Sequence, residues 1–307
     1  MNLGIVYLLP DWQYLEYVFS CSKLHKDPEN YELRIANMMR TEIEICKKNA
    51  VDVYYLLNGN TPQQFFIDQN GQCHDYEYQL FDQKHNTIMS LNKNLLLRSS
   101  CAEIEKPLSY LQSLGSFNIL TWKDECIVAD WHKHVSLEFT KRNILEIAKV
   151  KLNTALLKSF SARNRVFIKS KTKNFGIVTD TNISHFDVAN SLAALPDDEI
   201  LVISEPLDLC CDEHGPIEYR IWVSKYQATS ISRYIDEATH YQIPKEINKF
   251  AERFIKEYKD VFPAHYILDV GVNYNMEFSV IELNGMIASG RYYRNDFDVF
   301  LKVLRYK

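Results

Sequence analysis

Short apolar runs and helically spaced apolar positions alternate along the first third of the chain. Residues 4–9 form an apolar run that ends at Pro10, which predicts a buried strand. Apolar residues recur near helical spacing over 29–49, and 51–57 reads as a second strand. The other elements predicted here are a hairpin across 64–78 around Asn70-Gly71, a helix over 107–114 with Gly115 as its C-cap, and a strand over 117–121.

The pattern changes after a predicted helix over 139–158, a segment with few helix-breaking residues. Strands dominate from there on. They are predicted at 165–170, 200–204, 218–223, 265–272 and 277–283, with one amphipathic helix over 244–260. We therefore expect an α/β (α+β) protein with a small α/β domain over 1–115 and a second domain over 116–307.

Composition narrows the class of protein. A chain of 307 residues has room for about two domains, and its net charge of −5 gives no sign of a nucleic-acid partner. The seven cysteines are scattered without a CxxC pair, which favours free thiols in a reducing compartment. The first residues do not resemble a signal peptide, and no apolar run approaches the ~18 residues that span a bilayer. We expect a cytoplasmic protein that does not bind membranes.

The last two predicted strands carry a candidate metal site. Asp269 lies on the first strand, Glu282 and Asn284 lie at the end of the second, and a short turn joins them. Pairing of the strands brings the carboxylates to roughly 5 Å of each other, and Asn284 shares a face with Glu282. Two carboxylates and a carboxamide oxygen suit Mg²⁺. The alternative is a solvated hairpin with unrelated acids.

Lysines gather around the strand at 165–170. Lys169 lies among apolar neighbours, where an ammonium group is costly unless it meets an anion. Lys171 and Lys173 follow in a short polar segment before Asn174-Phe175-Gly176, which suits a phosphate-binding lid. The alternative is a strand that ends in a solvated basic turn.

Two later segments add candidate nucleotide contacts. Glu205-Pro206-Leu207 follows a buried strand and suits a hinge whose backbone reads an adenine edge, with Asp208 placed for a ribose hydroxyl. Most such stretches are merely strand ends. Arg220 lies on a strand beside apolar residues, where a guanidinium suits bidentate phosphate contact. An ion pair with Glu218 or Asp236 is the alternative for Arg220.

Other cysteine and histidine groups carry little chemistry. Cys126, His132 and His134 match no zinc spacing, and Cys210-Cys211 suits a strand edge better than a redox pair. Walker A, GxSxG, HExxH and kinase signatures are missing from the sequence.

The order of these features resembles the ATP-grasp superfamily. It runs Ile168-Lys169, the lysine-containing lid, the hinge at 202–207, Glu218-Tyr219-Arg220, and Asp269 followed by Glu282-Leu283-Asn284. The resemblance implies a nucleotide cleft between two subdomains and a preceding α/β domain. It implies that Lys169, Lys171, Lys173, Glu205, Pro206, Leu207, Asp208 and Arg220 bind ATP, and that Asp269, Glu282 and Asn284 bind Mg²⁺.

The lysine-containing lid and the short segment between Arg220 and Asp269 depart from the large biosynthetic members. The chain looks more like compact clades, which include uncharacterised bacterial and phage proteins and a eukaryotic assembly chaperone for an initiation factor. Ser230 to Tyr234 is similar to a segment of that chaperone.

The resemblance implies two functions. The first is an Mg-ATP-dependent carboxylate–amine (or carboxylate–thiol) ligase. A substrate carboxylate would become an acyl-phosphate, held by Arg220, Arg233 or Arg291, and pass to an amine of an amino acid, peptide or protein. The second is an ATP-binding assembly or regulatory protein without ligase turnover.

Overall fold

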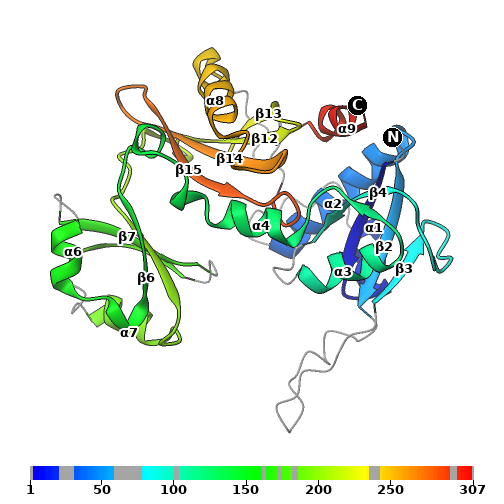
Figure 1. Ribbon diagram of the computed structural model, residues 1–307, viewed down its shortest axis with the longest axis horizontal. Helices are drawn as coiled ribbons and strands as arrows, with labels where there is room; N and C mark the ends of the chain where they lie inside the picture. The colour runs from blue at the N-terminus through cyan, green and yellow to red at the C-terminus, as the bar shows by residue number, and fades with distance from the viewer. Residues whose placement is uncertain are drawn as a thin grey trace, which may run out of the picture. The chain divides into compact units, whose positions relative to one another are not determined.

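The computed structural model describes residues 3–20, 31–58, 78–99, 104–160, 164–171, 175–181, 186–234, 243–290 and 296–305. The chain divides into two compact units (Figure 1). Unit 1 contains Met1–Trp131, Glu218–Val270 and Glu282–Lys307, and unit 2 contains His132–Ile217 and Gly271–Ile281. The predicted boundary between residues 115 and 116 stays a prediction.

The N-terminal part of unit 1 is a five-stranded sheet of order β3-β2-β1-β4-β5. Neighbouring strands are parallel except for β3, which runs antiparallel to β2 at the edge. The strands are β1 (Leu3–Leu9), β2 (Asp52–Asn58), β3 (Tyr78–Asp82), β4 (Asn94–Arg98) and β5 (Phe117–Asn118). The helices are α1 (Trp12–Ser20), α2 (Tyr31–Lys48), α3 (Glu105–Ser113) and α4 (Trp122–Ala129).

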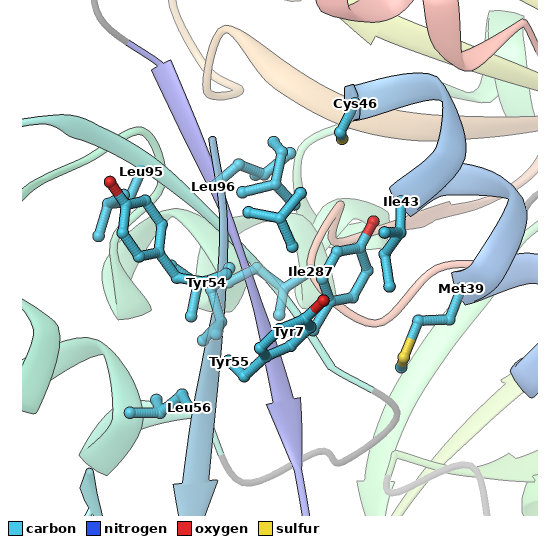
Figure 2. Packing of buried hydrophobic residues seen from close by; sticks show 14 of the residues in the cluster. Tyr7, Met39, Ile43, Cys46, Tyr54, Tyr55, Leu56, Leu95, Leu96 and Ile287 are labelled. Atoms are coloured by element: carbon cyan, nitrogen blue, oxygen red, sulfur yellow. The ribbon is translucent and has the colours of Figure 1, made fainter. Parts of the chain in front are cut away.

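Residues from both ends of the chain share the core of unit 1. Side chains of the N-terminal sheet pack in one buried cluster with Trp222, Ile287 and the apolar face of α9 (Phe297–Arg305). Figure 2 shows Ile287 among side chains of β1, β2, β4 and α2. The C-terminal residues are therefore part of the same hydrophobic core as the first strand.

A second sheet has the order β13-β12-β14-β15. Its strands are β12 (Glu218–Ser224), β13 (Gln227–Arg233), β14 (His265–Val272) and β15 (Phe278–Asn284), and α8 (Lys245–Tyr258) precedes β14. All eight residues of β14 are buried, as expected for an apolar central strand covered on both faces. β14 and β15 each contribute residues to both units.

Unit 2 is built on an antiparallel sheet of order β6-β9-β7-β8. Val166, Ile168, Leu201 and Ile203 face Leu157 of α6 and Leu192 of α7 in one buried cluster. The larger elements are β6 (Ile144–Ala148), β7 (Arg165–Ser170), β8 (Gly176–Asp180), β9 (Ile200–Ser204), α5 (Leu137–Thr140), α6 (Thr154–Phe160) and α7 (Phe186–Ala193). The smaller ones are β10 (Cys211–Asp212), β11 (Gly215–Pro216) and two 3₁₀ turns, Trp131–Lys133 and Lys149–Lys151.

The helix predicted over 139–158 is wrong. The helix α5 ends at Thr140 because Lys141 adopts a left-handed conformation with φ of 54°. Residues 144–148 then form β6, which pairs antiparallel with β9, and helix resumes only at Thr154. An extended partner strand far along the chain decides the conformation here, and the local pattern does not contain it.

The other predicted elements agree with the structure in type. The strand at 165–170 and the strand at 200–204 have the predicted bounds, whereas the strand predicted over 117–121 ends at Asn118. Gly176 and Ile177, predicted as part of the lid, belong to β8. The hairpin around Asn70-Gly71 lies outside the described residues. Among the helices described, none is long and apolar enough to cross a membrane.

Candidate functional site

The three predicted metal ligands lie together in the second sheet. Asp269 on β14 is 2% exposed, and Glu282 and Asn284 lie at the end of β15. The Asn284 amide nitrogen donates to Asp269 Oδ2 at 2.8 Å and to Glu282 Oε1 at 2.9 Å. The strand period of two places Glu282 and Asn284 on one face, which is why a single amide reaches both carboxylates.

Arg220 joins this group from β12. Its Nε and Nη2 donate to the two oxygens of Asp269 at 2.9 and 2.7 Å, and its Nη1 donates to the carbonyl of Gly290 at 3.1 Å. The guanidinium also lies 4.7 Å from the ring centroid of Tyr234. The predicted alternative for Arg220 was an ion pair with Glu218 or Asp236. Its carboxylate partner in these contacts is Asp269, one of the proposed metal ligands.

Glu218 belongs to the same group and was missed as a site residue. Burial, followed by the nearby charges of Asp269 and Glu282, raises the pKa of Glu218 to about 7, although Arg233 and Arg220 oppose this. The sequence did contain a signal, since Glu218 precedes Arg220 by two residues on a strand and therefore shares its face. A carboxyl that keeps its proton near neutral pH marks a region of strong negative potential.

The donor set fits Mg²⁺ by its chemistry. Among the described residues, no group of three or more His, Cys, Asp or Glu side chains is placed to hold a metal ion. The candidate set instead combines the carboxylates of Asp269 and Glu282 with the carboxamide of Asn284. Half a turn about χ2 of Asn284 presents its oxygen instead of its nitrogen. Such hard oxygen donors leave positions open for phosphate oxygens, as Mg²⁺ usually requires.

The predicted hinge lies in unit 2, directly after β9. The side chain of Glu205 accepts hydrogen bonds from the backbone and side-chain nitrogens of Asn143 at 3.3 and 3.2 Å. Arg142 donates to the carbonyls of Val280 and Ile281 at 3.2 and 2.7 Å. A cavity of about 160 Å³ is lined by Lys141, Arg142, residues 205–209, Asn273, Glu277 and Ser279.

The predicted lysines lie on and after β7, also in unit 2. Lys169 pairs with Gly176 on one side and Val202 on the other, and it shares a face with Phe167. The opposite face of β7 is the one packed in the core of unit 2. Lys171 Nζ lies 3.6 Å from Glu146 Oε2 on β6. Lys173 and Arg291 lie outside the described residues.

Arg233, the third predicted catalytic arginine, is 4% exposed at the end of β13, where it pairs with Tyr219 of β12. It lowers the pKa of Glu218 and so belongs to the electrostatic surroundings of the acid group. The structure thus brings Arg220, Arg233, Asp269, Glu282 and Asn284 together in unit 1, while the predicted hinge and Lys169 belong to unit 2.

The family assignment follows from residues 139–303, which match the model of an ATP-grasp domain family, the one numbered 2 within its clade. That span is more than half of the chain. The chain belongs to the ATP-grasp superfamily. The match covers β6 to α9, and therefore every residue predicted above to bind nucleotide or metal. The predicted family is confirmed.

Solved structures extend the similarity to the N-terminal sheet. The ATP-grasp ligase PsnB with its minimal precursor is 11% identical, with a TM-score of 0.54 over 99% of each chain. The D-alanine–D-alanine ligase from Coxiella burnetii is 13% identical, with a TM-score of 0.57 over 98% of this chain and 90% of the other. The Chryseobacterium gregarium RiPP-associated ligase, bound to ADP and a leader and core peptide, is 12% identical, with a TM-score of 0.53 over 98% and 91%. At these identities the likeness shows the ATP-grasp fold, which confirms the predicted fold class.

No curated protein matches the sequence.

Proposed function

We propose that this ATP-grasp protein is an Mg-ATP-dependent carboxylate–amine ligase that acts through an acyl-phosphate. The observation that carries the proposal is the acid group of unit 1, in which Asn284 joins the carboxylates of Asp269 and Glu282 next to Arg220. Hard oxygen donors beside a strand-borne arginine are what a metal-bound triphosphate requires.

The residues of unit 1 have separate roles in the proposal. Asp269, Glu282 and Asn284 hold Mg²⁺, and Mg-ATP supplies the phosphoryl group that activates a substrate carboxylate. Arg220 and Arg233 stabilise the charge that develops on phosphate oxygens. Arg291 is proposed to assist them, because Ser289-Gly290-Arg291 follows the metal-binding segment.

Residues of unit 2 are proposed to bind the rest of the nucleotide. The backbone of Glu205, Pro206 and Leu207 reads the adenine edge, and Asp208 accepts a ribose hydroxyl. Lys169 neutralises phosphate charge, assisted by Lys171 and Lys173. The face of β7 that carries Lys169 lies opposite the face packed in the core, which supports this role.

The proposed acceptor is an amine of an amino acid, a peptide or a protein terminus. Three of the similar structures support this class, since one is a D-alanine–D-alanine ligase and two ligases hold a precursor, or a leader and core peptide. A reaction that consumes ATP and free carboxylates suits the cytoplasm, where we propose that the protein acts.

The alternative is an assembly or regulatory protein that binds Mg-ATP without ligase turnover. One contact favours it. Arg220 already engages both oxygens of Asp269, which lowers the negative charge available to a cation. This alternative predicts tight binding of Mg-ATP and negligible release of ADP with any amine.

The deciding experiment measures ADP and phosphate release with pools of amino acids and short peptides. The ligase proposal expects release that depends on a carboxylate and an amine substrate together. Asp269→Ala and Glu282→Ala should each lower that turnover on the order of 100-fold, whereas Glu257→Gln on the exposed face of α8 should not. Unchanged turnover in both variants at 269 and 282 contradicts the assignment of the site.

A further inference from the structure

The loop formed by residues 285–290 links two groups that bind Asp269. It begins directly after Asn284, whose amide nitrogen donates to Asp269 Oδ2. It ends at Gly290, whose carbonyl accepts from the same arginine, Arg220, that pairs with Asp269. The conformation of the 285–290 loop therefore fixes the positions of both partners of Asp269.

Arg98 holds the carbonyl groups of the loop. It lies at the end of β4, is 4% exposed, and donates to the carbonyls of Met286, Ile287 and Ser289, the last at 3.0 Å. Its Nε and Nη2 also donate to the two oxygens of Glu42 at 3.2 and 3.0 Å. Since Glu42 is 0% exposed, the carboxylate orients a guanidinium that no water competes for.

Glu125 holds the N–H groups of the same loop. Its carboxylate, on the first turn of α4, accepts hydrogen bonds from the backbone of Ile287 and Met286. The capping box of Thr121 and Asp124 fixes the start of α4 and hence the position of Glu125. A Cβ atom added at Gly285 would overlap the Glu125 carboxylate, so this carboxylate also lies directly against the residue next to Asn284.

Burial of two side chains completes the attachment. Met286 and Ile287 are 0% and 1% exposed and belong to the core cluster of unit 1. Figure 2 shows the Ile287 side chain inserted among those of the N-terminal sheet. The loop is thus held by a cation on its carbonyls, a carboxylate on its N–H groups and two apolar anchors, and it begins at the residue that follows Asn284.

We propose that Arg98 and Glu125 are positioning residues that set the affinity of the Asp269–Glu282–Asn284 group for Mg²⁺. The inference rests on the proposed function of that group as a metal site. A loop fixed by these contacts keeps the Asn284 carboxamide within reach of both carboxylates. Release of the loop leaves the carboxylates in place and lets the carboxamide move away, so the site loses its third donor.

Glu125 gives the sharpest test. Glu125→Ala should speed amide exchange of Met286 and Ile287 in the metal-free protein and raise the Mn²⁺ dissociation constant, measured by electron paramagnetic resonance with a non-hydrolysable ATP analogue, about 10-fold or more. Nucleotide affinity without metal should stay within about 2-fold, since no contact of Glu125 is to the nucleotide in the proposal. Glu125→Gln retains an acceptor and should restore much of both effects. The control Glu257→Gln should behave as wild type.

Gly285 supplies a second test that does not depend on the charge of residue 125. Gly285→Ala should weaken Mn²⁺ binding in the same range, because the added methyl group collides with the Glu125 carboxylate. In a Glu125→Ala background, the same substitution should add little, so the two effects should be strongly non-additive. Arg98→Met is less informative, since it leaves Glu42 buried without this partner and so also weakens folding.

The outcomes separate this inference from the proposed function. Wild-type protein that binds no Mn²⁺ with the nucleotide overturns both. Wild-type protein that binds Mn²⁺, with Glu125→Ala and Gly285→Ala binding it equally well, overturns the positioning roles and leaves the metal site standing. Additive effects of the two substitutions also contradict the inference, because independent losses indicate general destabilisation.

Discussion

At the scale of residues, the acid group of unit 1 is organised around one buried charge. Asp269 is held by a bidentate pair with Arg220 and by the amide of Asn284, so its lone pairs are satisfied without water. Glu218 and Glu282 add carboxyls nearby, and the pKa of Glu218 rises to about 7 through burial and these charges. A cation that enters relieves this repulsion, which gives the group a physical reason to bind metal.

His265 makes the stability of unit 1 depend on pH. Burial, followed by the charge of Lys225, lowers the pKa of His265 to about 4, although Asp124 opposes this, and Nδ1 lies 2.9 Å from Ser224 Oγ. Between about pH 4 and the unfolded value near 6.5, the unfolded chain binds a proton that the folded chain does not. The free energy of unfolding should therefore fall as pH drops from 6.5, by roughly 2 kcal/mol at pH 5.

Urea denaturation of His265→Asn and wild type at pH 5 and 7.5 measures this. Glu125 and Glu218 act in the opposite direction, since their pKa values of about 7 add stability at low pH that is lost as pH rises through 7. The difference between wild type and variant cancels the carboxyl effects. If His265→Asn loses as much stability between pH 7.5 and 5 as wild type, the buried neutral histidine is not the cause.

At the scale of elements, sequence patterns predicted most strands and failed where a distant partner decides. The run at 165–170 was found with its bounds because it is a central strand whose apolar residues are contiguous. Residues 144–148 were predicted as helix, since their pairing with 200–204 lies more than fifty residues away. Asp269, Glu282 and Asn284 were found because one hairpin brings them together. Arg98 and Glu125 were missed because they contact the 285–290 loop across most of the chain, without a local signal.

Helix α4 offers a test of local capping on an element that carries Glu125. The Thr121 side chain accepts from the backbone of Asp124, while Asp124 accepts from the backbone of Thr121. Thr121→Ala should lower the free energy of unfolding by about 1 kcal/mol, measured by urea denaturation. Ser113→Ala, an exposed serine on α3, serves as the control. A loss in Thr121→Ala no larger than in the control means that the core, not the cap, holds this helix.

At the scale of the whole molecule, the tryptophans report on one unit only. All four, Trp12, Trp122, Trp131 and Trp222, belong to unit 1, which also contains the proposed metal ligands. Three separate segments of the chain form this unit, and the shared core of β1, Trp222 and α9 ties them together. Intrinsic fluorescence therefore measures the unfolding of the unit to which the metal is proposed to bind.

Mg²⁺ and nucleotide together should stabilise unit 1 by mass action. A ligand at 100 times its dissociation constant raises the free energy of unfolding by about 2.7 kcal/mol when it binds only the folded form. With a non-hydrolysable ATP analogue and Mg²⁺, the tryptophan-detected urea midpoint should rise by the corresponding amount, and EDTA should remove most of that gain. Glu282→Gln removes one charge from the acid group while keeping its shape, and should lose the metal-dependent part alone. Glu257→Gln should keep all of it. An analogue that stabilises the protein equally in Mg²⁺ and in EDTA is bound without the acid group, and Asp269, Glu282 and Asn284 then serve another purpose.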